Sequence, residues 1–443
     1  MDSTRSGSGA GSATSCDVIV IGGGFAGVVA ARELARAGRR AVLLEARDRL
    51  GGRTWYRELP GAGRKVELGG TWISSRTMRC ARAEVERYGL RLTRRDGAAP
   101  VFRWSLGDGL VPGFPLAGEE LYELERAWFE LILRARRIDP DRPLDGQSLA
   151  DLDVSVAALL HGLGLSTRVR AFLDIWARLG SGCTSEEWSG LQLLAWIAAL
   201  DWSVLGYFAE VSEVIETGTA SLLEAIVADA DVEIRLSEPV AAIRDAGDEV
   251  VVRLVDGGEL RAGAAVVAVP VNLWSSIDFG PPLAGARLEL AAAGHPGRMQ
   301  KVWVHARGAP ANLVALGSET GFVWLSAEYP VGGDEQLLVG FASPPSGVDP
   351  ADADAVGDAV RALAPEADVI GVASHDWSAD PWSRGTWMVP RSSWLSRSWS
   401  EVQAPVGRLA FAGADIATRW VGWIDGAVES GHRATADVLA MPA

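Results

Sequence analysis

The sequence predicts an α/β fold in which two domains are interleaved along the chain. Residues 17–45 contain a short apolar run, a helical stretch and a second apolar run, which is typical of a βαβ unit with buried parallel strands. Helical periodicity dominates residues 78–211, and strand-like segments return after residue 232. The 443 residues suffice for two or three domains of ~150 residues each. Because blocks of different character recur, neither domain is continuous in sequence.

Further elements follow the βαβ unit, which has strands at 17–22 and 40–45 around a helix at 27–38. Additional helices are predicted at 121–136, 154–163, 191–200, 218–229, 351–363 and about 426–439. Additional strands are predicted at 232–236, 239–244, 249–255, 264–269, 298–305, 322–326, 336–341 and 408–412.

The amino-acid composition excludes or disfavours several classes of protein. Hydrophobic residues make up 48% of the chain and charged residues 22%, which excludes a largely disordered protein. A net charge of −15 argues against nucleic-acid binding through phosphates and against a polybasic membrane anchor. Only two of the 42 basic residues are lysines, Lys65 and Lys301. This arginine bias is typical of a GC-rich bacterial genome, so a single arginine says little about chemistry.

Targeting signals and cysteines favour a cytoplasmic protein. Residues 1–15 are rich in serine and glycine and have no apolar core, so we expect a disordered tail and no signal peptide. The longest apolar runs, such as 193–200, are far shorter than the ~20 residues of a membrane-spanning helix. Cys16, Cys80 and Cys183 are widely spaced and form no disulfide framework or metal-ligand pattern. We therefore expect a reduced environment and no metal.

A glycine motif points to a dinucleotide. Gly22, Gly24 and Gly27 form G-x-G-x-x-G between the first strand and its helix, where glycines let the backbone approach a pyrophosphate. An acid about 20 residues later is needed for the ribose hydroxyls, and Glu45 stands there. An acid at this place favours FAD or NAD over NADP. Arg53, which follows two glycines, is suited to bidentate contact with the pyrophosphate.

Four sequence blocks carry a family resemblance. The blocks GGGFAG, LEARDRLGGRT, ELGGTW and FAGADIATRWVGWIDGAVESG resemble those of the flavin-dependent amine oxidases, the monoamine oxidase family. They occur in family order and at family spacing across residues 16–437, whereas 78–210 and 310–375 match only in texture. The resemblance implies a Rossmann-like FAD domain interleaved with an α+β substrate domain, a mixed sheet flanked by helices. The FAD domain would comprise 16–77, 212–285 and 384–443, and the substrate domain 78–211 and 286–383.

The resemblance also implies a set of cofactor contacts. Val240 would hold the adenine through its backbone, Gly69 to Thr71 would line the isoalloxazine, and residues 413–424 would close over the ribityl chain. The full set of expected FAD-binding residues is Gly22, Gly24, Gly27, Glu45, Ala46, Arg47, Gly52, Arg53, Gly69, Gly70, Thr71, Trp72, Val240, Trp377, Gly413, Asp415, Val421, Gly422 and Ile424.

Three residues are expected to act in catalysis by the same resemblance. Lys301 falls where the family has a lysine that is bridged through water to flavin N5. Trp387 and Trp423 fall at the two places of the aromatic cage that guides the amine. Thr386 replaces the cysteine that links FAD covalently in many members, so we expect noncovalent FAD.

The substrate loop departs from known subgroups. Trp72 stands where amino-acid oxidases hold the substrate carboxylate with an arginine, although Arg76 is only four residues away. Residues 73–76 are neutral and then positive, which disfavours a polyamine. Glu67 is expected to satisfy backbone donors, with a role as a base left open.

The implied reaction is oxidation of an amine C–N bond to an imine or iminium, with hydride transfer to flavin N5 and reoxidation by O2 to give H2O2. One alternative is a tailoring oxidase of secondary metabolism, acting on an amine or amide nitrogen of a larger substrate with intramolecular trapping of the iminium. Others are a C–C dehydrogenase and a non-catalytic flavin-binding protein. The expected partners are a small-molecule amine or amide and O2, and a homodimer is left open.

Overall fold

A parallel sheet forms the base of the nucleotide-binding region in the computed structural model, which describes residues 16–94, 99–209, 212–344 and 347–442. The predicted tail, 1–15, lies outside the described residues. Five parallel strands pair in the order β20-β13-β1-β2-β9. Their bounds are β1 Val18–Ile21, β2 Ala41–Leu44, β9 Glu233–Arg235, β13 Ala264–Val267 and β20 Leu409–Phe411.

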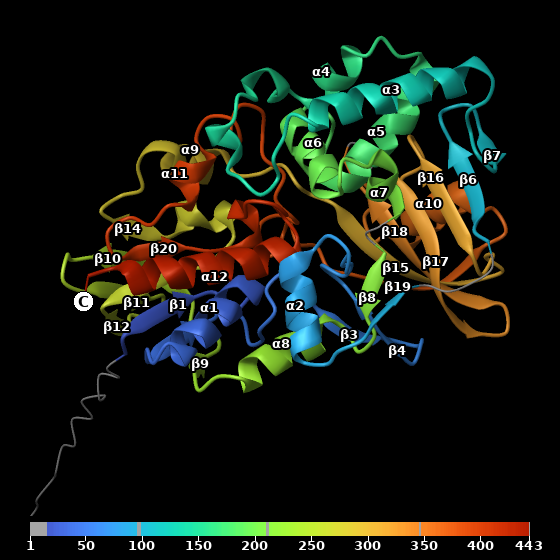
Figure 1. The fold of residues 1–443 in the computed structure, drawn as a ribbon. Coiled ribbons are helices and arrows are strands. Elements are labelled where there is room, and N and C mark those ends of the chain that lie inside the picture. The colour runs from blue at the N-terminus through green and yellow to red at the C-terminus, as the bar shows by residue number, and fades with distance from the viewer. Residues whose placement is uncertain (1–15, 95–98, 210–211, 345–346, 443) are drawn as a thin grey trace, which may run out of the picture.

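The predicted βαβ unit is present at the start of this sheet. All four residues of β1 are buried, as expected for an apolar strand between two neighbours. Helix α1 (Phe25–Arg36) follows the glycine-rich turn and packs against α12 (Ile424–Ala440). Asp425, in the first turn of α12, accepts a hydrogen bond from Ala81 N at 2.8 Å, which joins α12 to α2 (Arg79–Arg87). Figure 1 shows α12 running alongside α1, although some 400 residues separate them.

A second, larger sheet lies at the other side of the molecule (Figure 1). Its seven strands pair in the order β19-β15-β18-β17-β16-β6-β7, mostly antiparallel with one parallel pair, β16 and β6. The bounds are β6 Val101–Ser105, β7 Leu110–Pro112, β15 Gln300–Arg307, β16 Leu313–Gly317, β17 Trp324–Gly332, β18 Glu335–Ala342 and β19 Asp368–Ser374.

This sheet corrects the helical assignment of residues 78–211. Strands β6 and β7 lie inside that segment and join the sheet through β16, some 200 residues further along the chain. Short strands with a distant partner leave no periodicity strong enough to separate them from the surrounding helices.

The remaining strands form smaller sheets. They are the four-stranded sheet β12 (Glu259–Ala262), β11 (Val250–Leu254), β10 (Val240–Asp245) and β14 (Asp278–Gly280), the hairpin β3 (Tyr56–Leu59) with β4 (Arg64–Glu67), and the pair β5 (Leu92–Arg94) with β8 (Glu213–Ile215).

Helices cover the sheets on several sides. Helices α3 to α6 gather above the seven-stranded sheet in Figure 1, and α10 packs against β16, β6 and β19. The bounds of the other helices are α3 Glu119–Ala135, α4 Val156–His161, α5 Thr167–Ser181, α6 Gly190–Ala199, α7 Val204–Ala209, α8 Thr219–Ala228, α9 Gly285–Ala293, α10 Ala353–Leu363 and α11 Trp399–Gln403. In the described part of the chain, none of the helices has the length and apolar character needed to cross a membrane.

The α/β fold class is confirmed, with a mixed sheet flanked by helices beside the parallel one. The parallel sheet draws its strands from 16–77, 212–285 and 384–443, and the seven-stranded sheet draws its strands from 78–211 and 286–383. The domain boundaries themselves stay a prediction.

Candidate active site

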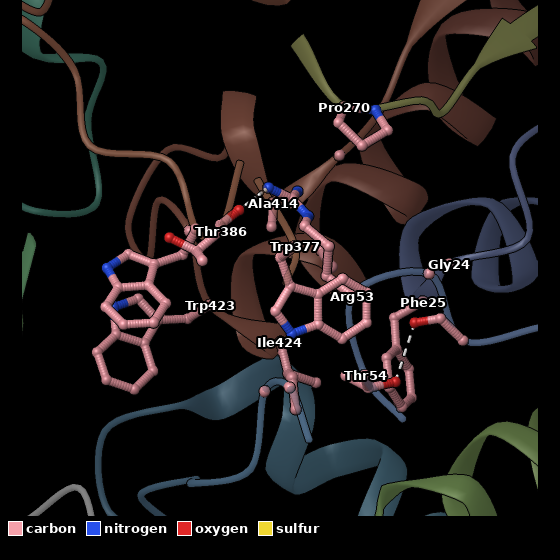
Figure 2. Close-up of a pocket in the computed structure, with 18 of the residues that line it drawn as sticks. Gly24, Phe25, Arg53, Thr54, Pro270, Trp377, Thr386, Ala414, Trp423 and Ile424 are labelled. Carbon is pink, nitrogen blue, oxygen red and sulfur yellow. Dashed lines mark hydrogen bonds between the residues drawn. The ribbon is translucent and has the colours of Figure 1, made fainter. Parts of the chain in front are cut away.

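A cavity of about 660 Å³ opens between the two large sheets. Its walls include the glycine-rich turn at one end and a group of aromatic side chains at the other. Figure 2 shows Gly24 and Phe25 on one side, Trp423 on the other, and Arg53 and Trp377 between them. The residues predicted from sequence that line the cavity are Gly22, Gly24, Glu45, Ala46, Arg47, Gly52, Arg53, Gly69, Gly70, Thr71, Trp72, Val240, Trp377, Gly413, Gly422, Ile424, Lys301, Trp387 and Trp423.

Three predicted residues lie behind this wall: Gly27, Asp415 and Val421. Gly27 faces the turn, because a Cβ there would stand 1.9 Å from the carbonyl oxygen of Gly22. Its requirement for glycine therefore comes from close packing of α1 on the turn. Val421 is 1% exposed and fills the core under the cavity.

Glu45 organises the nucleotide end of the cavity. Its carboxylate is buried and accepts hydrogen bonds from Gly23 N at 2.6 Å and Arg47 N at 2.8 Å. The Arg47 guanidinium turns to Asp380, with Nη2 to Oδ1 at 2.6 Å. The Glu45 carboxylate thus stands at the end of β2, as the glycine motif predicted, while Arg47 ties this loop to a distant segment.

Arg53 is held beside the cavity by two partners. Its Nη2 donates to Asp415 Oδ1 at 2.6 Å and its Nη1 donates to the Thr386 carbonyl at 2.5 Å. Burial alone would raise the pKa of the Asp415 carboxyl, but the Arg53 guanidinium, neighbouring His295 and a hydrogen bond from Val271 N lower it. Asp415 therefore acts on the cavity by orienting Arg53.

Residues 68–72 form one wall of the cavity, and Glu67 lies directly before them. The Trp377 indole, which also lines the cavity, donates to the Leu68 carbonyl at 3.0 Å and holds this segment in place. Buried Glu67 accepts a hydrogen bond from Thr219 N at 2.6 Å, at the start of α8. Glu67 is therefore placed to satisfy a backbone donor, and it is not among the described residues that line the cavity.

Lys301 is a buried cation in the cavity wall, 4% exposed. Its Nζ donates to Thr71 Oγ1 at 2.6 Å and to the Gly69 carbonyl at 3.1 Å. Burial lowers the pKa of its ammonium to about 8, against the opposing effect of the Glu67 and Glu328 carboxylates. An ammonium has three donors, so one remains for a molecule in the cavity.

Trp387 and Trp423 come from separate segments that meet in the fold. A Cβ on Gly422, the residue before Trp423, would lie 3.3 Å from the Trp387 Cβ. The Trp387 Nε1 donates to the Gly180 carbonyl at 2.7 Å, whereas the Trp423 indole packs edge-on against Trp196 and Trp420.

Several residues at the aromatic end of the cavity were not predicted from the sequence. The walls also include Trp176, Trp196, Tyr207, Trp324, Glu328 and Phe341. Trp303 and Phe341 face Lys301 as well, with ring centroids 5.6 and 5.9 Å from its Nζ. Because side chains alternate along a strand, Trp303, two residues after Lys301, can be predicted to share its face of β15. The position of Phe341 beside Lys301 cannot be predicted in this way, because it depends on the pairing register of β15 with β18.

Arg76 has no place in the cavity wall. It forms an ion pair with Asp201 and is not among the described residues that line the cavity. Its guanidinium is therefore poorly placed to bind a substrate carboxylate, in keeping with the tryptophan at position 72.

Comparison with known proteins decides the family. A family model described as flavin containing amine oxidoreductase matches residues 25–439. The chain belongs to this family. The cofactor is FAD, and the reaction is oxidation of an amine at its C–N bond. The resemblance inferred from the four sequence blocks is thereby confirmed.

Relatives of this flavin-containing amine oxidoreductase include several proteins named for amine substrates. It is 37% identical to (S)-6-hydroxynicotine oxidase of Paenarthrobacter nicotinovorans, over 96% of this chain and 99% of that protein. It is 36% identical to pseudooxynicotine dehydrogenase of a Pseudomonas species, over 94% and 84%. The structure superposes on wild-type putrescine oxidase bound to putrescine with a TM-score of 0.82, at 25% identity and over 96% and 99% of the two chains.

The residues at the nucleotide end fit FAD. A Cβ on Gly24 would have the Gly52 Cα, at 3.9 Å, as its nearest neighbour, so the space above the start of α1 is open. The N-cap residue of α1, Gly24, has no side chain that could cap the first N–H groups of the helix, so these groups can donate to a phosphate. Arg53 adds a positive charge beside this space, and Glu45 offers carboxylate oxygens for ribose hydroxyls.

We expect FAD to be released without protein hydrolysis. Thr386 lines the cavity and accepts a hydrogen bond from Met299 N on its Oγ1 at 3.3 Å, and it has no thiol to form a thioether. Acid precipitation should leave all the yellow colour in the supernatant. Colour that stays with the pellet after washing would show a covalent link at another residue.

Proposed function

We propose that this flavoenzyme oxidises the C–N bond of an amine that has one cationic nitrogen and a bulky aromatic or alicyclic body, with O2 as electron acceptor. The observation that carries the proposal is the set of side chains at the aromatic end of the cavity, opposite the glycine-rich turn. Tryptophans from α5, α6 and β17 line it, and Glu328 is the one carboxylate among its described residues. The nicotine-related names of two relatives, at 37% and 36% identity, support a heterocyclic amine.

The chain's own residues bind and orient the amine. FAD, when bound, supplies the hydride acceptor. Trp387 and Trp423 offer aromatic faces, which favour positive charge developing on nitrogen. The third donor of Lys301 is suited to hold a water molecule at the cavity wall. The apolar walls exclude bulk water and strengthen these electrostatic contacts.

Anaerobic mixing with a panel of amines tests the substrate class. Cyclic amines with an aromatic substituent should bleach the flavin, whereas putrescine and α-amino acids should leave it yellow. Bleaching by putrescine alone would contradict the proposal.

The electron acceptor needs its own measurement, because one relative is named an oxidase and the other a dehydrogenase. Reoxidation in air-saturated buffer should be fast and yield one H2O2 per flavin. Slow reoxidation in air, with fast reoxidation by a dye, would instead indicate a dehydrogenase.

Glu328 is expected to attract the substrate's positive charge. It accepts a hydrogen bond from Ser326 Oγ at 2.7 Å and stands where the register of β17 shifts between Ala327 and Tyr329. Such bulges re-aim side chains next to active sites. Glu328→Gln should lower kcat/KM for a cationic amine about tenfold, equal to ~1.4 kcal/mol.

The matched control is Glu238→Gln, which removes a carboxylate from the nucleotide end of the same cavity. It should leave the KM for the amine unchanged. Equal effects of the two variants would show that Glu328 acts only through the overall charge of the cavity.

A further inference from the structure

We infer that Trp72 is a positioning residue for Lys301, which holds the lysine ammonium at the cavity wall through the face of its indole ring. The Lys301 Nζ lies over the Trp72 ring at 4.6 Å from the centroid. The family resemblance implies for Trp72 only a contact with FAD and no contact with the lysine.

The contact belongs to an aromatic enclosure around the ammonium. Phe341 faces Lys301 directly across the pairing of β15 with β18, and Trp303 follows on the same face of β15. The Trp72 ring in turn packs on Phe341, with centroids 5.6 Å apart. Of the three rings, Trp72 is the nearest to the Nζ and the only one from outside the seven-stranded sheet.

Hydrogen bonds fix Lys301 to the short segment that carries the Trp72 indole. Lys301 donates to Gly69 O and Thr71 Oγ1, and Trp72 follows directly in the chain. The acceptors hold the ammonium on one side and the indole face covers another. The two acceptors and the Trp72 ring together therefore set the direction of the remaining N–H donor of Lys301.

The Lys301 ammonium is buried and therefore needs a stabilising neighbour such as this indole ring. A buried ammonium loses its hydration and requires compensating interactions, and an aromatic face in a desolvated site supplies one. The charged groups that act on Lys301 are Glu67, from β4, and Glu328, from β17. The Nζ donates its hydrogen bonds to Gly69 O and Thr71 Oγ1, and the Trp72 ring lies against it.

The chain offers a direct test, because Lys65 and Lys301 are its only lysines. Protein labelled with ¹³C at lysine Cε gives two lysine signals, and exposed Lys65 serves as the internal reference. Protons above an aromatic face are shifted upfield by the ring current. The Lys301 CεH2 signal of the FAD-loaded wild type should therefore lie upfield of the Lys65 signal and titrate with a pKa of about 8.

Trp72→Leu removes the ring and keeps an apolar side chain. Its Lys301 signal should move toward the Lys65 position, and its midpoint should fall by about one pH unit, a tenfold loss of proton affinity. Trp72→Phe, which keeps a smaller aromatic face, should lie between Trp72→Leu and the wild type. The matched control is Trp176→Leu, which removes another half-buried indole from the same cavity and should leave shift and midpoint unchanged.

A Lys301 signal in Trp72→Leu with the wild-type shift and midpoint would overturn the inference. Release of FAD from Trp72→Phe would also overturn it, because Trp72 would then be a cofactor contact. The contact between Trp72 and Lys301 affects catalysis only if Lys301 has its proposed role, and in this respect the inference rests on the proposed function. The titration uses no substrate, so its outcome is separate from whether any amine is oxidised.

Discussion

Replacement of Lys301 by methionine is expected to slow flavin reduction or reoxidation by about a hundredfold while FAD stays bound, the loss typical of one positioned donor. Methionine keeps the length and apolar stem of the side chain but removes the ammonium, which donates to Gly69 O and Thr71 Oγ1. Stopped-flow traces of the two half-reactions identify the step affected.

The pH dependence of the reaction rate provides a second test of the Lys301→Met variant. Burial lowers the pKa of Lys301 to about 8, so the ammonium is present below pH 8 and lost above it. If the ammonium is the active form, the rate of the affected step falls as the pH rises through about 8. Lys301→Met should abolish this inflection. Unchanged rates in both half-reactions would make Lys301 a structural residue only.

The exposed Lys65 provides the control for this experiment. Lys65→Met removes the other lysine of the chain from the surface of β4 and should leave both half-reactions and their pH profiles unchanged. An inflection at pH 8 that survives in Lys301→Met would belong to another group, such as the substrate amine.

Trp387→Ala and Trp423→Ala are each expected to lower kcat/KM by more than tenfold, because a desolvated cation–π contact contributes about 2 kcal/mol. Both indoles line the cavity and neither is fully buried, so truncation should cost less stability than the loss of a core tryptophan. The flavin spectrum and the melting temperature should stay close to those of the wild type.

A role in the core predicts the reverse result. Truncation of a buried tryptophan costs about 3–5 kcal/mol of stability, with little change in the activity of the molecules that remain folded. Trp188→Ala is the matched control, since Trp188 is 0% exposed and is not among the described lining residues. kcat/KM per bound flavin, measured beside the melting curve, separates the two cases for each variant.

Sequence reasoning was strongest where a function depends on a short, contiguous stretch of backbone. The strand, glycine turn and helix of residues 17–38 are local, so their apolar runs and glycines can be interpreted without a partner. Glu45 follows from its place at the end of the next strand. Lys301 was found through the family resemblance, helped by the scarcity of lysine in this chain.

Residue roles that depend on long-range pairing were not visible. Phe341 reaches Lys301 through the register of β15 with β18, and Asp415 reaches Arg53 across 362 residues. Glu328 enters the cavity at a shift in strand register, which alternation of side chains does not predict. Arg47, expected to bind FAD, has its guanidinium on Asp380.

The sequence by itself determined the α/β class, the nucleotide motif and the flavin-dependent amine oxidoreductase family, because these depend on periodicity and short motifs that adjacent residues encode. Only the tertiary structure decided which aromatic and charged side chains surround Lys301 and the substrate end. These side chains come from strands and loops that lie far apart in sequence, and the contacts between them exist only once the sheets have paired and packed.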